Sequence, residues 1–257
     1  MATQPGVINK TLLVDTDILF FKFACRNENI IDWGDGESLD IDEDKAIIEF
    51  DSFLIDVMEK TECRELMLCM THDVNFRYSV LPTYKHNRQD KVRPELIKTL
   101  KEHAWTNYPC KQVKWLEADD VMGILGSKDP NKYVVASTDK DMKTVPCTLF
   151  NWDKDEKPRR ISIEEADYWF HYQWLTGDST DGYTGCPKIG PVKAKRLLDD
   201  TPREEWVEVI LEKYAEKCFS YEEILQQARV ARILRYGEYD FKNKEVILWQ
   251  PKFHSNS

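Results

Sequence analysis

The sequence lacks the features that mark several common classes of protein. It has no apolar run of about 18 residues, so it predicts no transmembrane helix and no membrane partner. Its first ten residues lack the charged-then-apolar layout of a secretory signal. Seven cysteines occur without a Cys-x-x-Cys pair or the Cys/His spacing of structural zinc, and there is no internal repeat. We therefore expect a cytoplasmic protein whose thiols stay reduced.

Charge is distributed unevenly along the 257 residues. The net charge of −10, taken alone, argues against a nucleic-acid partner. Residues 77–101, however, contain seven Lys or Arg and two acids, and residues 185–198 contain four basic residues and no acid. Residues 28–51 carry ten acids and one Lys, which we interpret as a solvated loop and helix face. Because the basic charge is concentrated, a polyanionic partner is compatible with the sequence.

Short apolar runs alternate with helical patterns through the first 160 residues. Strands, most of which end near an acid, are predicted at residues 11–15, 65–70, 112–115, 133–136 and 147–152. Residues 29–44 are predicted to form a loop. This order indicates an α/β fold with a mostly parallel central sheet flanked by helices. Residues 161–257 are mainly helical, with an amphipathic helix at 221–234, and we expect them to pack with residues 1–160 as one compact unit.

Carboxylates gather at the predicted strand ends and at one predicted helix start. They are Asp15, Glu117, Asp119, Asp120, Asp139 and Asp141. Acids gathered at the edge of a buried sheet repel one another and cost folding energy unless a positive group joins them. Because hard oxygen ligands suit Mg²⁺ or Mn²⁺, and two-metal hydrolysis needs several carboxylates, the pattern predicts a site for metal-dependent phosphate chemistry. For Glu117 and Asp120, the alternative is a role as helix N-terminal acids that the helix dipole favours.

A second motif begins at Gly185 and ends near Leu198. Its pattern, Gly-x-Pro-x-Ile-Gly-x-x-x-Ala-x-x-Leu, is typical of a helix–hairpin–helix. The glycines let the backbone approach a phosphate, whose oxygens the N–H groups can then bind. Lys188, Lys193 and Lys195 can supply charge that is independent of nucleotide sequence. The alternative is an ordinary αα-hairpin with a solvated basic face.

A third group interleaves aromatic and basic residues. It comprises Phe76, Arg77 and the run from Pro82 to Arg88, which includes Tyr84 and Lys85. Rings that stack on bases and cations that follow the backbone suit single-stranded nucleic acid. The alternative is a solvated, charged surface.

These motifs, in this order, resemble those of the 5′ nuclease superfamily of flap endonucleases and 5′→3′ exonucleases, most closely its short bacteriophage-type members. The resemblance depends on Glu117-Ala118-Asp119-Asp120, Thr138-Asp139-Lys140-Asp141 and Gly177-Asp178-x-x-Asp181 followed by the hairpin. It extends from Leu12 to about Leu198, and residues 231–241 are similar to the phage-type tail. It implies an α/β nuclease core with a helical arch at about 74–104 and a helix–three-turn–helix at about 177–200.

The resemblance implies a centre of two Mg²⁺ ions, for which Mn²⁺ can substitute. Its ligands would be Asp15, Asp73, Glu117, Asp119, Asp120, Asp139, Asp141, Asp178 and Asp181. Asp139 would also be a catalytic residue, together with Lys85 and Arg88, which would contact the scissile phosphate. Asp73 departs from the family pattern, because it sits closer to the Phe-Arg pair than the family spacing has it.

The resemblance also implies a DNA partner with a 5′ end, a flap or a junction between duplex and single strand, with an RNA–DNA hybrid as a further candidate. DNA-binding residues would be Arg77, Tyr84, Lys85, Arg88, Gly185, Lys188, Gly190, Lys193 and Lys195. In some members the hairpin also holds K⁺. The implied protein is a monomer that acts in the cytoplasm, that of the host cell for a virus, in DNA replication or degradation. Its products carry a 5′-phosphate.

Two other functions are compatible with part of this pattern. A DNA-binding module that has lost turnover would keep the hairpin and the arch, and the displaced Asp73 is the feature that favours it. A PIN-type endoribonuclease would share the acidic sheet edge. Proteins of that type are usually shorter and lack the hairpin, so residues 185–198 weigh against this alternative.

Overall fold

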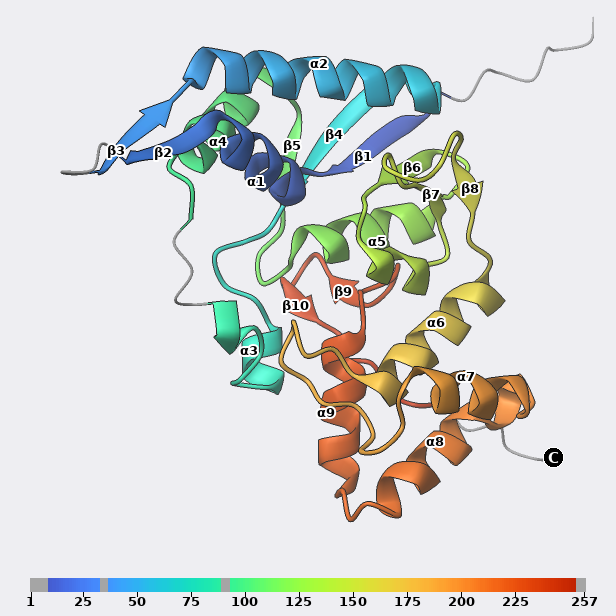
Figure 1. The fold of residues 1–257 in the computed structure, drawn as a ribbon. Helices are drawn as coiled ribbons and strands as arrows, with labels where there is room; N and C mark the ends of the chain where they lie inside the picture. Colours follow the sequence, from blue (N-terminus) through green and yellow to red (C-terminus); the bar gives the residue numbers. More distant parts are fainter. Residues whose placement is uncertain (1–8, 33–36, 89–92, 253–257) are drawn as a thin grey trace, which may run out of the picture.

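A six-stranded sheet lies at the centre of the computed structural model, which describes residues 9–32, 37–88 and 93–252 (Figure 1). The strand order is β5-β4-β1-β6-β7-β8, and all but β8 are parallel. Their bounds are β1 Thr11–Asp15, β4 Glu65–Met70, β5 Cys110–Gln112, β6 Tyr133–Ala136, β7 Thr148–Phe150 and β8 Arg159–Arg160. Because the carboxyl ends of parallel strands share one edge, the residues that follow them meet there.

β1 is a central strand that is covered on both faces. All five of its residues are buried, as expected for a parallel strand between two helical layers. Leu12 and Val14 belong to one hydrophobic cluster and Leu13 to another, because successive side chains point to opposite faces. The first cluster is covered by α1 (Thr16–Asn27), α2 (Glu43–Thr61) and α4 (Leu96–Asn107), and the second by α5 (Ala118–Lys128) (Figure 1).

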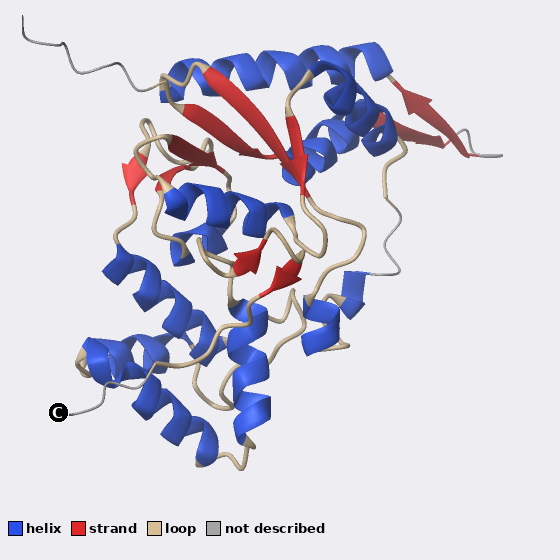
Figure 2. Cartoon of the chain, turned by 180° about the vertical axis from the view of Figure 1, so that it is seen from behind, coloured by secondary structure: helices blue, strands red, loops and turns tan. Residues whose placement is uncertain are grey.

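The helices that follow the sheet continue the α5 layer, as the view from behind also shows (Figure 2). They are α6 Ile163–Thr176, α7 Pro191–Asp199, α8 Trp206–Ala215 and α9 Tyr221–Ala231, with the 3₁₀ turn η3 Arg203–Glu205. Another 3₁₀ turn, η2 Lys140–Thr144, lies between β6 and β7. Ser162 caps α6 as expected, since its hydroxyl accepts the N–H of Glu165 at 3.1 Å. Phe170 and Trp174 of α6 share one hydrophobic cluster with Leu13. The hydrophobic core therefore runs from the sheet into the helical part. The domain boundary expected at residue 160 stays a prediction.

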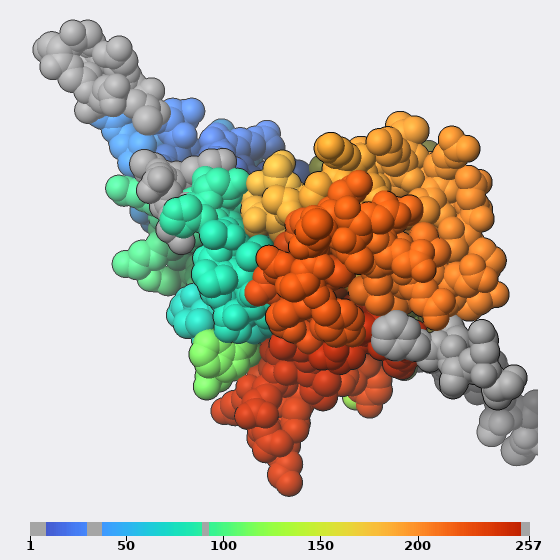
Figure 3. Space-filling view, turned by 90° about the horizontal axis from the view of Figure 1, so that it is seen from below, coloured from blue at the N-terminus to red at the C-terminus, as the bar shows by residue number. Residues whose placement is uncertain are grey.

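Two irregular stretches lie beside the carboxyl edge of the sheet. One contains α3 (Arg77–Val80) and the turn η1 (His86–Arg88), within the predicted arch. Residues 89–92 of that arch, which include Lys91 of the basic run, lie outside the described residues. The other stretch is residues 177–190, which join α6 to α7. The view from below shows the first stretch, in teal, directly beside the helical part (Figure 3).

The predicted α/β class is confirmed, as are the strands at residues 11–15, 65–70 and 133–136. The prediction of a loop at 29–44 is wrong. The antiparallel pair β2 (Glu28–Asp32) and β3 (Glu37–Ile41) lies there, and residues 33–36 lie outside the described residues. None of the helices in the described ranges has both the length and the hydropathy that a membrane crossing requires.

Other predicted elements differ in their bounds. The strand expected at 112–115 ends at Gln112, and the strand expected at 147–152 comprises only residues 148–150. The helix expected at 221–234 ends at Ala231, because the N–H of Leu234 bonds to the Asp120 carboxylate instead of to the helix. The chain then crosses α5 and forms a last pair of short strands, β9 (Tyr239–Asp240) and β10 (Glu245–Val246).

This C-terminal segment passes so close to α5 that Gly123 has no room for a side chain. A Cβ at Gly123 would meet the carbonyl oxygen of Leu234 and lie 2.8 Å from Cγ2 of Ile233. We expect Gly123→Ala to lower the free energy of unfolding by about 1–3 kcal/mol through overpacking. Helix propensity alone would raise it by about 1 kcal/mol. Urea unfolding measures the sign of the change in the free energy of unfolding. A variant at least as stable as wild type would contradict the close approach of the C-terminal segment to α5.

Candidate active site

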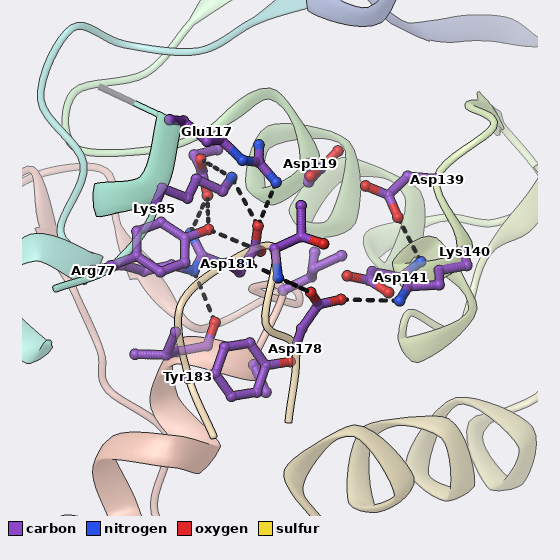
Figure 4. A pocket seen from close by; sticks show the side chains of 16 residues that line it. Arg77, Lys85, Glu117, Asp119, Asp139, Lys140, Asp141, Asp178, Asp181 and Tyr183 are labelled. Atoms are coloured by element: carbon purple, nitrogen blue, oxygen red, sulfur yellow. Dashed lines mark hydrogen bonds and ion pairs between the residues drawn. The ribbon is translucent and has the colours of Figure 1, made fainter. Parts of the chain in front are cut away.

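A cleft of about 180 Å³ lies beyond the carboxyl edge of the sheet (Figure 4). Its walls come from α3, η1, the start of α5, η2, the loop after α6 and the end of α9. Six carboxylates line it, namely Glu117, Asp119, Asp139, Asp141, Asp178 and Asp181. Four cationic side chains line it as well, namely Arg77, Lys85, Arg88 and Lys140. Residues from about a third to nine-tenths of the way along the chain therefore meet in one polar cleft.

Short hydrogen bonds fix the acids that follow β1 and β6. Asp15 is the last residue of β1, and the hydroxyl of Ser137, which follows the neighbouring strand β6, donates to its carboxylate at 2.8 Å. The same Ser137 hydroxyl accepts the N–H of Asp139 at 3.0 Å. The Asp139 carboxylate in turn accepts the N–H of Asp141 at 2.8 Å. Asp139 is thereby the N-cap of η2. The parallel pairing of β1 with β6 thus brings three predicted ligands together.

The acids nearest the sheet have little positive charge near them to stabilise their ionised forms. Burial raises the pKa of Asp15 to about 7, and Asp17 and Asp139 add to the shift although the Ser137 hydrogen bond opposes it. Burial, followed by Asp15 and Asp139, raises the pKa of Asp119 well above its usual range. Burial and Asp139 also raise the pKa of Asp141 to about 7. Within the described residues, none of these three carboxylates forms an ion pair.

Glu117 lies on the opposite, neutralised side of the cleft. It is the N-cap of α5, and its carboxylate accepts from Lys85 Nζ at 2.7 Å and from the Tyr84 hydroxyl at 2.9 Å. Arg77 contacts it at 3.1 Å. Burial alone would raise the pKa of Glu117, but Lys85 and Arg77 outweigh it and lower the pKa to about 2. The cleft therefore has one half that is paired with cations and one half that is not.

The loop after α6 brings two more predicted ligands to the cleft. Asp178 pairs with Lys140 at 2.9 Å, and this cation lowers the pKa of Asp178 against the effect of burial. Asp181 pairs with Arg88 at 2.7 Å and lies 3.9 Å from Lys85. Burial nevertheless keeps the pKa of Asp181 raised. In Figure 4, Lys85 and Lys140 approach the acids from opposite sides.

Arg77 and Asp120, for which a DNA-binding role and a metal-ligand role are predicted, form a buried ion pair. Asp120 is 0% exposed and Arg77 is 2% exposed, and two guanidinium nitrogens contact the carboxylate at 2.7 and 2.8 Å. The remaining donors of Arg77 bond to the carbonyls of Val230 and Arg232, and Asp120 also accepts the N–H of Leu234. In this structure both side chains are thus engaged with each other and with backbone, and their predicted roles stay predictions.

Two further predicted residues lie apart from the cleft or are buried. Asp73 is exposed and does not line the cleft, and its role as a ligand stays a prediction. Gly185 is buried and its N–H bonds to the side chain of Gln227 at 3.0 Å, and its contact with DNA stays a prediction. The other predicted residues of the hairpin are exposed around the start of α7, and they are Lys188, Gly190, Lys193 and Lys195.

The metal-binding capacity of the cleft follows from its donor chemistry. Within the described residues, no three Asp, Glu, His or Cys side chains already stand close enough to form a metal site, since several are turned toward cations. All of the candidate donors are nevertheless carboxylate oxygens, which suit hard divalent ions. Asp139 raises the pKa of Asp15, Asp119 and Asp141, and Asp15 also raises that of Asp119, so an added positive charge would relieve repulsion among these acids.

Three residues of the site were not predicted as functional. Lys140 lies inside the Thr138–Asp141 motif, so its place in the cleft could have been read from the sequence. Ser137, which orients Asp15, directly precedes that motif. Gln173, whose amide donates to the Asp141 carboxylate, comes from α6 and gives no sequence signal, because only tertiary packing brings it there.

The sheet, the acidic cleft and the basic hairpin define a nuclease of the α/β class. Residues 10–165 match the family described as 5′–3′ exonuclease, N-terminal resolvase-like domain. The chain therefore belongs to the 5′–3′ exonuclease family, which confirms the resemblance.

Relatives and solved structures agree with this assignment. The exodeoxyribonuclease of Enterobacteria phage T3 is 32% identical over 225 residues, which cover 73% of this chain and 74% of the relative. The flap endonuclease Xni of Vibrio atlanticus is 31% identical over 188 residues, covering 63% and 68%. A solved pseudo-enzyme–product complex of the bacteriophage T5 flap endonuclease with DNA and metal ions has a TM-score of 0.62 at 15% identity, covering 86% of this chain and 88% of that one. That likeness shows a shared fold.

The Arg77–Asp120 pair gives a stability prediction. Replacing Arg77 by Met leaves the Asp120 carboxylate buried without its cation, so we expect the free energy of unfolding to fall by about 3–5 kcal/mol. The double variant Arg77→Met/Asp120→Leu removes both charges and should recover part of that loss. Urea unfolding of the single and double variants measures both values. A single variant within about 0.5 kcal/mol of wild type would show that the pair has no structural role.

Proposed function

We propose that this member of the family is a divalent-metal-dependent DNA nuclease that cleaves from a 5′ end or at a 5′ flap and leaves 5′-phosphate products during DNA replication or degradation. The observation that carries the proposal is the two-sided charge of the cleft. Asp15, Asp119 and Asp141 concentrate poorly compensated negative charge, while Lys85 and Arg88 lie across the same cleft. Metal ions would bind to the acids on one side of the cleft, and a phosphate would bind to the cations on the other side.

Mg²⁺ is the proposed cofactor, and Mn²⁺ should replace it because it takes the same oxygen ligands. When bound, two such ions would lower the pKa of a water molecule and neutralise charge on the phosphate. The residues that would hold them are Asp15, Glu117, Asp119, Asp139, Asp141, Asp178 and Asp181. Their side chains line the cleft, apart from Asp15, which ends β1 and is near enough to Asp119 to raise its pKa.

Lys85 and Arg88 are proposed to stabilise the negative charge that develops on the scissile phosphate. Both already neutralise carboxylates of the cleft, Glu117 and Asp181 respectively. Tyr84 supports this arrangement from a buried position, because its hydroxyl contacts Glu117 at 2.9 Å and Asp181 at 3.4 Å. A phosphate in the cleft would therefore find two cations already held at its edge.

The hairpin between α6 and α7 is proposed to hold the duplex part of the substrate. Gly190 is the N-cap of α7, is exposed and has no atom within 4 Å of a built Cβ, so a phosphate can approach the backbone there. Lys188, Lys193 and Lys195 surround it and add charge. The proposal also includes a K⁺ ion at this hairpin and action on RNA–DNA hybrids. We further propose that the protein is a monomer and acts in the host cytoplasm.

Metal binding should depend on pH in a defined direction. The raised pKa of Asp15 and Asp141, about 7 each, means that both hold protons at pH 6 and lose them by pH 8. A divalent ion must displace those protons, so its apparent affinity should rise by about tenfold per pH unit for each proton displaced. We expect Mg²⁺ to raise the melting temperature more at pH 8 than at pH 6. Without metal, these two groups should destabilise the fold as pH rises from about 4 to about 7.

Thermal melting with and without Mg²⁺ at both pH values checks this expectation. Asp141→Asn should reduce the difference between the two values, whereas Asp73→Asn should match wild type because Asp73 lies outside the cleft. An equal Mg²⁺ effect at pH 6 and pH 8 would contradict the assignment of these acids to the metal site.

Cleavage of a 5′-flap oligonucleotide tests the function directly. We expect the wild type with Mg²⁺ to release labelled 5′ products. Asp139→Ala should slow turnover by at least about 100-fold, since even outer partners of a metal ligand are worth up to that factor. Lys85→Ala should slow it by about 100-fold through lost charge stabilisation. DNA affinity should change by less than about threefold in both variants, because most phosphate contacts remain.

Product analysis and a filter-binding assay measure the two quantities, with Asp73→Asn as the control variant. Equal losses of turnover and affinity would contradict the catalytic roles. A wild type that releases no product with either Mg²⁺ or Mn²⁺ would contradict the proposed function itself.

A further inference from the structure

The segment that carries Tyr84, Lys85 and Arg88 is fastened by its backbone to the loop after α6. We call residues 83–88 the arch base and residues 178–183 the acidic loop. The N–H of Lys85 donates to the carbonyl of Asp181 at 2.9 Å. The side-chain amide of Asn87 donates to the carbonyl of Ser179 at 3.1 Å. These contacts are separate from the ion pairs of Lys85 and Arg88.

The acidic loop is itself closed and stiff. Asp178 and Tyr183 exchange two backbone hydrogen bonds, of 2.9 and 3.1 Å. The Asp178 carboxylate also accepts the N–H of Thr180 at 2.7 Å, which fixes the turn between them. Tyr183 is only 3% exposed and anchors the loop in the core. The loop therefore offers the arch base a fixed surface.

Lys85 depends on that surface for its backbone conformation. Its φ is +52°, in the left-handed region, which costs a residue with a Cβ about 1–2 kcal/mol. Such strain persists only where surrounding contacts determine the conformation. The hydrogen bond to the Asp181 carbonyl is such a contact. Lys85 Nζ reaches Glu117 from this strained backbone, so the loop decides where the cation points.

Gly182 lets the two backbones approach each other. Its φ is +78°, and a Cβ built on it would lie 2.9 Å from the carbonyl oxygen of Thr83 and 3.5 Å from the N of Lys85. A side chain at this position would push the arch base away from the loop. Because the displaced atoms belong to backbone, no rotation of a flexible side chain could relieve the contact.

We propose that Asn87 and Gly182 are positioning residues, which hold Lys85 and Arg88 at the acidic cleft without touching the reacting atoms. This inference rests on the proposed function and names two residues that act through others. The acidic loop continues into the hairpin, where Gly185 packs against the backbone of Gly177, so the same stiff stretch joins the phosphate-binding cations to the duplex-binding element. Loss of either contact should slow the chemical step and leave DNA affinity unchanged.

Asn87 gives the first test, with a matched control at its partner residue. Asn87→Ala removes the donor to the Ser179 carbonyl, whereas Ser179→Ala keeps that carbonyl. Both residues are exposed, so both variants should fold. We expect Asn87→Ala to slow single-turnover cleavage of saturating 5′-flap DNA by about three- to tenfold, the worth of one hydrogen bond. Ser179→Ala should stay within about twofold of wild type, and Asn87→Gln, which keeps an amide donor, should recover most of the rate.

Gly182 gives the second test, and Gly237 provides its control. Gly237 has a φ of +90° and nothing within 4 Å of a built Cβ. Both Gly→Ala variants thus place a methyl group on a left-handed residue, but only the one at Gly182 meets the arch base. We expect Gly182→Ala to slow cleavage by about 100-fold, as a misplacement of about 1 Å can. Gly237→Ala should stay within about threefold.

Affinity for the same DNA, measured in EDTA, provides the readout that separates positioning from general damage. Kd should stay within about twofold of wild type in all variants, because the exposed lysines of the hairpin are unchanged. Equal rates for Asn87→Ala and Ser179→Ala would overturn the inference, as would rate and affinity falling together. If Gly182→Ala fails to fold, the Asn87 series decides alone. An inactive wild type overturns the proposed function instead, so the two failures are distinguishable.

Discussion

Electrostatic repulsion among buried carboxylates is the constraint to which the rest of this site responds. Asp15, Asp119 and Asp141 are raised in pKa because burial disfavours their ionised forms and neighbouring acids add to the effect. A fold built for stability alone would pair such groups or replace them with apolar residues. Among the acids that line the cleft in the described residues, ion pairs are confined to Glu117, Asp178 and Asp181, which meet Lys85, Lys140 and Arg88, and Arg77 also contacts Glu117. The unpaired half is what a metal-dependent nuclease needs.

The same cleft is held together by a buried ion pair and by close backbone packing. The Arg77–Asp120 pair connects the arch side to the start of α5, and the remaining donors of Arg77 bond to backbone carbonyls at the end of α9. Gly123 then lets the C-terminal segment lie directly on α5. One buried cation thus joins three parts of the chain that are remote in sequence. The walls of the cleft depend on these contacts as much as its carboxylates depend on the sheet.

Local sequence patterns were sufficient to predict where the acids at strand ends lie. A buried strand followed by a carboxylate specifies both the element and the edge where the acid lies, so Asp15, Asp139 and Asp141 could be assigned from the sequence. Other surroundings could not be predicted in this way. Asp73, Arg77, Asp120 and Gly185 were assigned by motif position, and motif position does not reveal burial or the partner of a side chain. The hairpin of β2 and β3 was missed because its segments are rich in acids and show no sustained alternation of polar and apolar residues.

The sequence by itself determined the α/β class, the family and the set of acids and bases from which the site is made, because periodicity and motif spacing are local properties. Tertiary structure alone decided which of them meet. Arg77 and Asp120 became a structural pair, and Lys85 took its strained backbone from the Asp181 carbonyl 96 residues away in the chain (181 − 85). Such choices depend on distances between remote segments, which are fixed only when the core packs and excludes water.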